Sequence, residues 1–209
     1  MSSRPPESQN PRSERENRGT SRYGIDLPPS VVEALDAYAE LLRRWAPRLN
    51  LVGTGDLTFL EERHLGDSLR LLRFVAEAPP GPCIDVGSGA GLPGIPLALA
   101  LPKRHWRLLE PRRNRAAFLE RAVRELGVEA EVVVDSAEGA ARKEGFAAAH
   151  AVATARALAP PPDALKKLLP LVRPGGLALL LQGRNAVVSE GTEVPEPGIA
   201  IVRTDRGIG

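Results

Sequence analysis

The sequence is poor in cysteine, in aromatic residues and in long apolar stretches. One cysteine, Cys83, among 209 residues excludes an internal disulfide and a metal site built from several cysteines. Aromatic residues make up 4% of the chain, too few for extended base-stacking platforms. No run approaches the ~18 consecutive apolar residues of a membrane span, and the first residues lack the apolar segment of a secretory signal. We therefore expect a cytoplasmic protein with no membrane partner, and we expect a monomer.

The first third of the chain divides by composition. Residues 1–24 hold Ser, Pro, Arg, Glu and Asn with almost no apolar side chain, so we expect a disordered tail. Apolar residues then recur at helical spacing from residue 28 to Pro47, and a second helix is predicted over residues 57–75. Because these helices precede any strand signal, residues 25–78 are predicted to form an N-terminal helical extension.

Residues 79–209 alternate short apolar strands with helical segments. Such alternation is typical of a doubly wound, Rossmann-like α/β domain, a mostly parallel sheet with helices on both faces. Ligands of such sheets bind at the carboxyl ends of the strands. Strands are predicted at 83–86, 106–110, 130–136, 150–157, 177–182 and 198–205, and helices at 92–101, 112–127 and 162–172.

The segment CIDVGSGAGLPG (residues 83–94) joins the first strand to a helix and ends in a literal G-x-G-x-x-G. Glycines there let the backbone approach a ligand closely, as Gly87 and Gly89 would. Asp85 precedes them and opposes a dianionic pyrophosphate, whereas it complements the ammonium and sulfonium of S-adenosylmethionine. Pro93 offers no amide to a phosphate. The loop thus favours a methyl donor over a dinucleotide or a purely structural glycine turn.

Glu110 ends the second predicted strand, where a carboxylate can accept both hydroxyls of a ribose. Dinucleotide enzymes use an acid at the same place, so Glu110 indicates a nucleoside-bearing cofactor without choosing between the two.

Residues that the chain lacks restrict which kind of atom could accept the methyl group. Methylation at carbon 5 of a pyrimidine needs a nucleophile, normally a loop cysteine, but the lone Cys83 precedes the cofactor loop. Enzymes that methylate an exocyclic amine usually carry a polar-Pro-Pro-aromatic loop. The corresponding segment here, LAPPPD (158–163), lacks both the polar and the aromatic residue. A ring nitrogen with a free lone pair needs alignment and exclusion of water rather than a base, so it is compatible with this sequence.

Several motifs together resemble the bacterial small-subunit ribosomal RNA guanine-N7 methyltransferases, the glucose-inhibited division protein B family. They are WAPRLNLVGTGDLTFLEERHLGDSLRLL (45–72), IDVGSGAGLPGIPLALALP (84–102), RNRAAFLERAVRELG (113–127), DSAE (135–138), TARALAP (154–160) and LPLVRPGGLALLLQG (169–183). The resemblance implies transfer of a methyl group from S-adenosylmethionine to N7 of a guanosine in the 530-loop region of 16S ribosomal RNA, on the small ribosomal subunit.

The resemblance also implies site residues. It adds Gly87, Leu92, Ala137, Glu138 and Arg156 to the cofactor contacts already expected at Asp85, Gly89 and Glu110. Arg156 is placed beside the transfer site, and no catalytic residue or metal ligand is assigned. Glu138 could instead be a carboxylate at the start of a helix, and Arg156 an ion-pair partner.

Asn50, His64 and Asp67 match the family's helical extension and are candidate substrate contacts. An ordinary His–Asp pair that joins two helices is the alternative for His64 and Asp67. Basic residues between Arg112 and Arg124 could contact RNA phosphates or could form a solvated surface.

One departure from the family concerns the end of the chain, where the final strand is expected to be missing or very short. Two other functions remain open: an NAD-dependent oxidoreductase, and a non-catalytic RNA-binding or ribosome-assembly factor that retains the cofactor fold.

Overall fold

The computed structural model describes residues 22–183 and 192–205. Residues 1–21 of the expected disordered tail therefore lie outside the described residues. In the described part of the chain, no helix is long and apolar enough to cross a membrane, and no cluster of His, Cys, Asp and Glu side chains could hold a metal ion.

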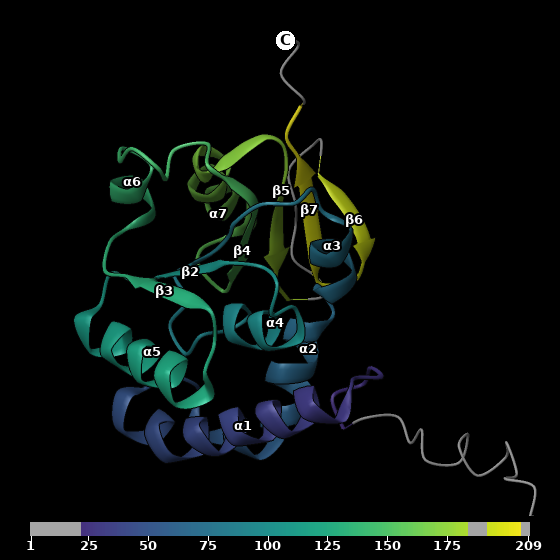
Figure 1. Cartoon of the computed structure of the whole chain (residues 1–209), viewed down its shortest axis with the longest axis vertical. Helices are drawn as coiled ribbons and strands as arrows, with labels where there is room; N and C mark the ends of the chain where they lie inside the picture. Colours follow the sequence, from purple (N-terminus) through teal and green to yellow (C-terminus); the bar gives the residue numbers. More distant parts are fainter. Residues whose placement is uncertain (1–21, 184–191, 206–209) are drawn as a thin grey trace, which may run out of the picture.

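One sheet of seven strands forms the centre of the molecule (Figure 1). Its order is β3-β2-β1-β4-β5-β7-β6, with parallel pairing from β3 to β5 and antiparallel pairing of β7 with both neighbours. The strands are β1 (Cys83–Val86), β2 (Trp106–Leu109), β3 (Ala130–Val133), β4 (His150–Arg156), β5 (Val172–Leu181), β6 (Glu193–Glu196) and β7 (Ile199–Arg203). This topology confirms the predicted Rossmann-like α/β fold.

The final strand, expected to be missing or very short, is present as a strand of five residues. The predicted strand at 198–205 is β7, which pairs antiparallel with β5 from Leu177↔Arg203 to Leu181↔Ile199. The edge position is taken by β6, which sequence reasoning missed because its residues EVPE are largely exposed and include a proline.

Helices cover both faces of the sheet. They are α4 (Gly94–Ala100), α5 (Arg113–Leu126), α6 (Ala137–Ala140) and α7 (Pro161–Leu168), which continues as a 3-10 turn over Leu169–Leu171. Neighbouring residues of β2 show the two layers: Leu108 packs in one cluster with residues of α4 and α5, and Leu109 in another with residues of α6 and α7. Alternate side chains of a strand point to opposite faces, which explains this division.

The N-terminal helices differ from the prediction in two respects. Helix α1 (Pro29–Leu49) runs through Pro47 instead of ending there. The single helix expected over 57–75 is instead broken into a 3-10 segment (Thr54–Phe59), a π-helical segment (Leu60–Gly66), α2 (Asp67–Leu69) and α3 (Leu72–Glu77). The π segment ends at Gly66, where a Cβ would stand 2.9 Å from the carbonyl oxygen of Tyr23. That close approach, a tertiary contact, is invisible to helical periodicity.

Helix α1 lies below α4 and α5 in Figure 1 and buries Leu35, Tyr38 and Leu42 in the same cluster as Leu92 and Leu108 of the α/β part. The apolar core is therefore continuous across residue 78. The division into an extension at 25–78 and a domain at 79–209 stays a prediction.

Candidate functional site

The glycine loop follows β1 and is tied to the end of β2. The amides of Gly87 and Ser88 both donate to the carbonyl of Leu109, at 2.8 and 3.0 Å. Gly87 and Gly89 have φ of +70° and +55°, in the left-handed region that favours glycine. A Cβ at Gly87 would also stand 2.6 Å from Cδ1 of Leu158, so any side chain there would push that leucine aside.

Asp85 is completely buried beneath this loop. Its Oδ1 accepts a hydrogen bond from the Thr154 hydroxyl at 2.8 Å, and its Oδ2 accepts one from the Gly94 amide at 3.2 Å. Burial raises the pKa of the Asp85 carboxyl to about 6, although both hydrogen bonds act to lower it. The carboxylate therefore joins β1, β4 and the first residue of α4, and its contact with a cofactor stays a prediction.

Glu110 connects the glycine loop to the segment after β2. Its Oε2 accepts the amide of Gly89 and its Oε1 accepts the amide of Arg112, each at 2.9 Å. The side chain is nearly fully buried. Because each carboxylate oxygen has a second lone pair, Glu110 is oriented beside Gly89 with further acceptor capacity.

Tyr38 reaches the same loop from α1. Its hydroxyl is completely buried and donates a hydrogen bond to the carbonyl of Ala90, between two loop glycines. A Cβ at Gly91 would stand 2.8 Å from this hydroxyl oxygen. Sequence reasoning placed Tyr38 only in the apolar pattern of a helix, and no local signal distinguishes a tyrosine that supports a loop 52 residues away.

Arg156 and His64, predicted separately, lie together. The Arg156 guanidinium donates from Nη2 to Nδ1 of His64 at 2.7 Å and from Nη1 to its carbonyl at 3.3 Å. Guanidinium has no acceptor atom, so Nδ1 is the acceptor and the neutral ring carries its proton on Nε2. The end of β4 is thereby joined to the π-helical segment.

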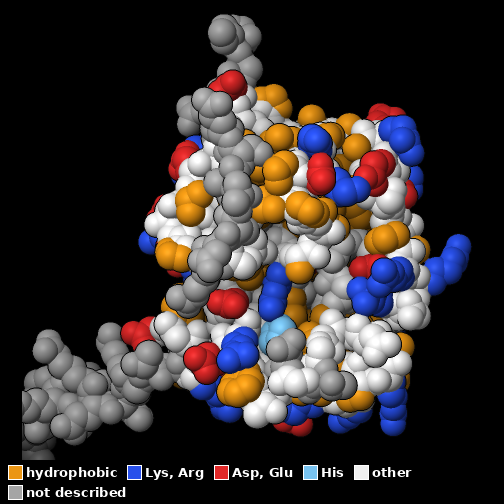
Figure 2. All heavy atoms as spheres, turned by 180° about the vertical axis from the view of Figure 1, so that it is seen from behind, with side chains coloured by type: hydrophobic (Ala, Val, Ile, Leu, Met, Phe, Trp, Pro, Cys, Tyr) orange, Lys and Arg blue, Asp and Glu red, His pale blue; other side chains and the backbone are white. Residues whose placement is uncertain are grey.

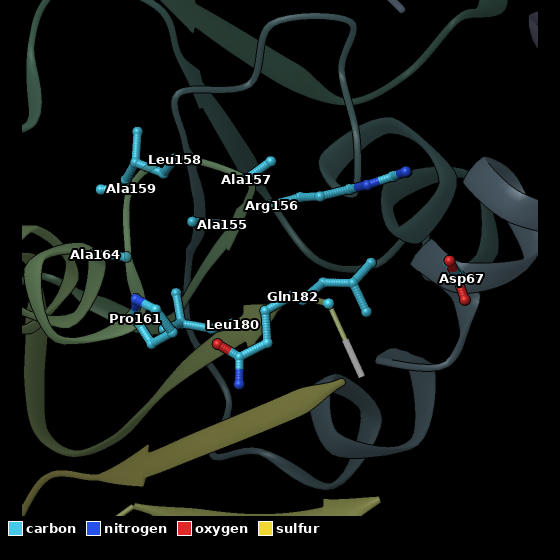
Figure 3. A pocket seen from close by; sticks show the side chains of 12 residues that line it. Asp67, Ala155, Arg156, Ala157, Leu158, Ala159, Pro161, Ala164, Leu180 and Gln182 are labelled. Carbon is cyan, nitrogen blue, oxygen red and sulfur yellow. The ribbon is translucent and has the colours of Figure 1, made fainter. Parts of the chain in front are cut away.

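A cavity of about 440 Å³ opens where β4 and β5 end. Asp67 stands on α2 across the hollow from Leu158 and Ala159, which follow β4, and Gln182 follows β5 (Figure 3). Since Leu158 also packs against Gly87, one wall of the cavity adjoins the glycine loop. The structure thus brings Asp67 and Arg156 to one cavity.

The contacts that the structure gives for Asn50 are made by its backbone. It ends α1 in the left-handed conformation, with φ of 49°, which asparagine tolerates better than most residues. Its carbonyl accepts a hydrogen bond at 3.0 Å from Arg115, whose guanidinium lies next to Gly89. Contact of the Asn50 side chain with a substrate stays a prediction.

The other three predicted cofactor contacts are Leu92, Ala137 and Glu138. Leu92 is buried in the cluster that includes α1 residues. Ala137 and Glu138 begin α6, and Glu138 forms an ion pair with Lys167 of α7. The alternative for Glu138, a carboxylate in the first turn of a helix, describes its position; its contact with an adenine stays a prediction.

Comparison with known proteins places this arrangement in a family. Residues 31–192 match the family model described as rRNA small subunit methyltransferase G. The chain is 38% identical to the ribosomal RNA small subunit methyltransferase G of Paracoccus denitrificans over 154 residues, 73% of this chain and 77% of that protein. It is 43% identical to the protein of that name from Granulibacter bethesdensis over 164 residues, 78% of this chain and 73% of the relative.

A solved methyltransferase from Geobacter sulfurreducens is similar in fold, with a TM-score of 0.57 and 14% identity. The match covers 83% of this chain and 88% of that one. The sheet therefore has the Rossmann-like fold of S-adenosylmethionine-dependent methyltransferases, as the sequence predicted.

Proposed function

Because the chain belongs to the rRNA small subunit methyltransferase G family, we propose that it transfers a methyl group from S-adenosylmethionine to N7 of a guanosine in 16S ribosomal RNA. The proposed target lies in the 530-loop region of the small ribosomal subunit. The observation that carries the proposal is the Glu110 carboxylate held beside the amide of Gly89 at the carboxyl edge of the sheet.

The residues present fit the donor. Gly87 and Gly89 leave the loop without side chains where a ligand would approach, and the Glu110 oxygens are aimed at the same place by two backbone amides. We propose that Glu110 accepts the ribose hydroxyls and that Asp85 favours the donor's positive charge. Leu92, Ala137, Glu138 and Arg156 complete the proposed contacts. When bound, S-adenosylmethionine supplies a methyl group made electrophilic by its sulfonium.

The acceptor needs little chemistry from the chain. N7 of guanine attacks with its own lone pair, so the protein has only to align the base and exclude water. The cavity beside Leu158 offers such a place, next to the loop proposed for the donor.

RNA contact is proposed for α5 and the segment before it. Arg112, Arg113, Arg115, Arg121 and Arg124 lie there with two acidic residues, Glu120 and Glu125. On the face seen from behind Figure 1, by contrast, basic and acidic side chains lie beside one another (Figure 2). The excess of positive charge on α5 favours a polyanion.

The test is transfer of tritiated methyl to small subunits isolated from cells that lack this protein, followed by digestion to nucleosides. Label in 7-methylguanosine is expected. Calorimetric titration should show S-adenosylmethionine bound and NAD ignored. NAD binding in place of the methyl donor would favour the oxidoreductase, and binding to subunits without transfer would favour the assembly factor.

A further inference from the structure

The cavity at the ends of β4 and β5 has the character of a site for a flat base. Its volume of about 440 Å³ lies within the ~300–1,000 Å³ usual for small-molecule sites. Much of its lining is small or apolar, including Ala155, Ala157, Ala159 and Leu180. Sequence-specific RNA recognition commonly takes an unstacked base into such a place.

The polar groups of the cavity include two acceptors. Asp67 is the one carboxylate among the described residues that line it. The Oε1 atom of Gln182 is buried and has no hydrogen-bond partner among those described residues. A buried acceptor without a partner costs free energy until a donor meets it, so this cavity favours a ligand with N–H donors.

The Asp67 carboxylate has room for such a ligand. Its side chain is 39% exposed, and its ion pair with Arg70 is long, 3.5 Å between Oδ1 and Nη1. A partly exposed pair of this length contributes little and leaves most of the carboxylate's acceptor positions open.

Guanine is the RNA base that presents two adjacent N–H donors, N1–H and the N2 amine, which match the two oxygens of a carboxylate. Adenine, cytosine and uracil place an acceptor beside each donor on the corresponding edge. We propose that Asp67 binds the N1–H and N2–H edge of the acceptor guanine and thereby selects guanine. This inference rests on the proposed function.

The position of Asp67 agrees with attack by N7. In a purine, N7 lies on the side opposite N1 and the N2 amine. Asp67 stands across the hollow from Leu158 (Figure 3), and Leu158 packs against Gly87. A guanine held by Asp67 at one edge therefore directs N7 toward the wall that adjoins the glycine loop.

The test compares Asp67→Asn with wild type in methyl transfer to small subunits from cells lacking the protein. An amide presents one oxygen and one N–H group, so it loses one acceptor and opposes one guanine donor. We expect kcat/KM for subunits to fall about 10- to 100-fold, the usual value of a bidentate base contact. The dissociation constant for S-adenosylmethionine and the melting temperature should stay unchanged.

Two further variants separate recognition from structure. Asp67→Glu keeps the carboxylate and should recover part of the lost kcat/KM. Glu40→Gln removes a comparable i,i+3 pair, with Arg43 on α1, and should leave transfer unchanged.

Unchanged kcat/KM in Asp67→Asn would overturn the inference, as would equal losses in the Asn and Glu variants accompanied by a lower melting temperature. A wild-type protein that methylates no subunits would instead contradict the proposed function.

Discussion

Replacing Asp85 by asparagine is expected to stabilise the protein at neutral pH. The carboxylate is completely buried, and burial raises its pKa from 3.8 to about 6. Because the folded-state pKa lies above the unfolded one, the charged carboxylate costs free energy of folding at every pH above about 4. The cost is absent below the unfolded pKa and reaches its full value once the pH exceeds the folded pKa of about 6.

The size of this effect follows from the same two values. A rise from 3.8 to about 6 corresponds to about 3 kcal/mol at pH 8, and to about half of that at pH 5. Asparagine keeps the shape of the side chain: its oxygen can accept from the Gly94 amide while its NH₂ group donates to the Thr154 hydroxyl. For a chain of this length, about 3 kcal/mol raises the melting temperature by roughly 6–12 °C.

Urea unfolding of wild type and Asp85→Asn at pH 5, 6, 7 and 8 measures the difference in free energy at each pH. The advantage of the variant should grow by about 1.5 kcal/mol from pH 5 to pH 8. A difference that stays constant or shrinks over this range would refute the reasoning. The same variant should bind S-adenosylmethionine more weakly, because it loses the charge proposed to favour the donor.

Two further predictions concern Tyr38 and His150, which lie outside the predicted site. Tyr38→Phe leaves the Ala90 carbonyl without its donor and should weaken S-adenosylmethionine binding about 3- to 10-fold by calorimetry. Tyr23→Phe is the matched control, because it removes a hydroxyl that donates to a carboxylate of α1, the helix that carries Tyr38. Equal affinity for S-adenosylmethionine in the two variants would contradict a role of Tyr38 in supporting the loop. Burial lowers the pKa of His150, whose Nε2 lies 3.2 Å from the Arg107 guanidinium. The neutral His150 ring contributes to the free energy of unfolding above the unfolded pKa of 6.5, and this contribution is lost as the pH falls below that value. The stability advantage of wild type over His150→Gln in urea should therefore shrink from pH 7.5 to pH 5.5, and a constant advantage would argue against it.

The local sequence pattern was sufficient to predict the bounds of elements that begin and end at residues such as proline and glycine. The predicted strand at 83–86 is β1 without change, and the helix predicted at 112–127 differs from α5 by one residue at each end. Gly127 ends that helix with a φ of +62°, as its position predicted. The bounds of these two elements depend on short-range interactions, so they can be predicted from the apolar residues and from the proline and glycine residues nearby.

Elements decided by distant contacts could not be predicted. Strand β5 begins at Val172, five residues before the predicted start, because Val172 pairs with His150 of β4. RPGG reads locally as a turn, yet the amide of Gly175 bonds to the carbonyls of Thr204 and Asp205, just after β7. The same limit applies to the site. Asp85 and Glu110 could be proposed from sequence because they lie at the carboxyl ends of predicted strands, whereas the support from Tyr38 depends on packing between α1 and the loop.

The contacts of Tyr38 with Ala90 and of Arg156 with His64 attach the N-terminal helices to the catalytic fold at two separate points. Ordering of the helices and ordering of the loop are then linked equilibria, and linkage is reciprocal. An RNA that fixes the helices should raise donor affinity by the same factor by which the donor raises RNA affinity. We therefore predict that S-adenosylmethionine and RNA bind cooperatively rather than independently.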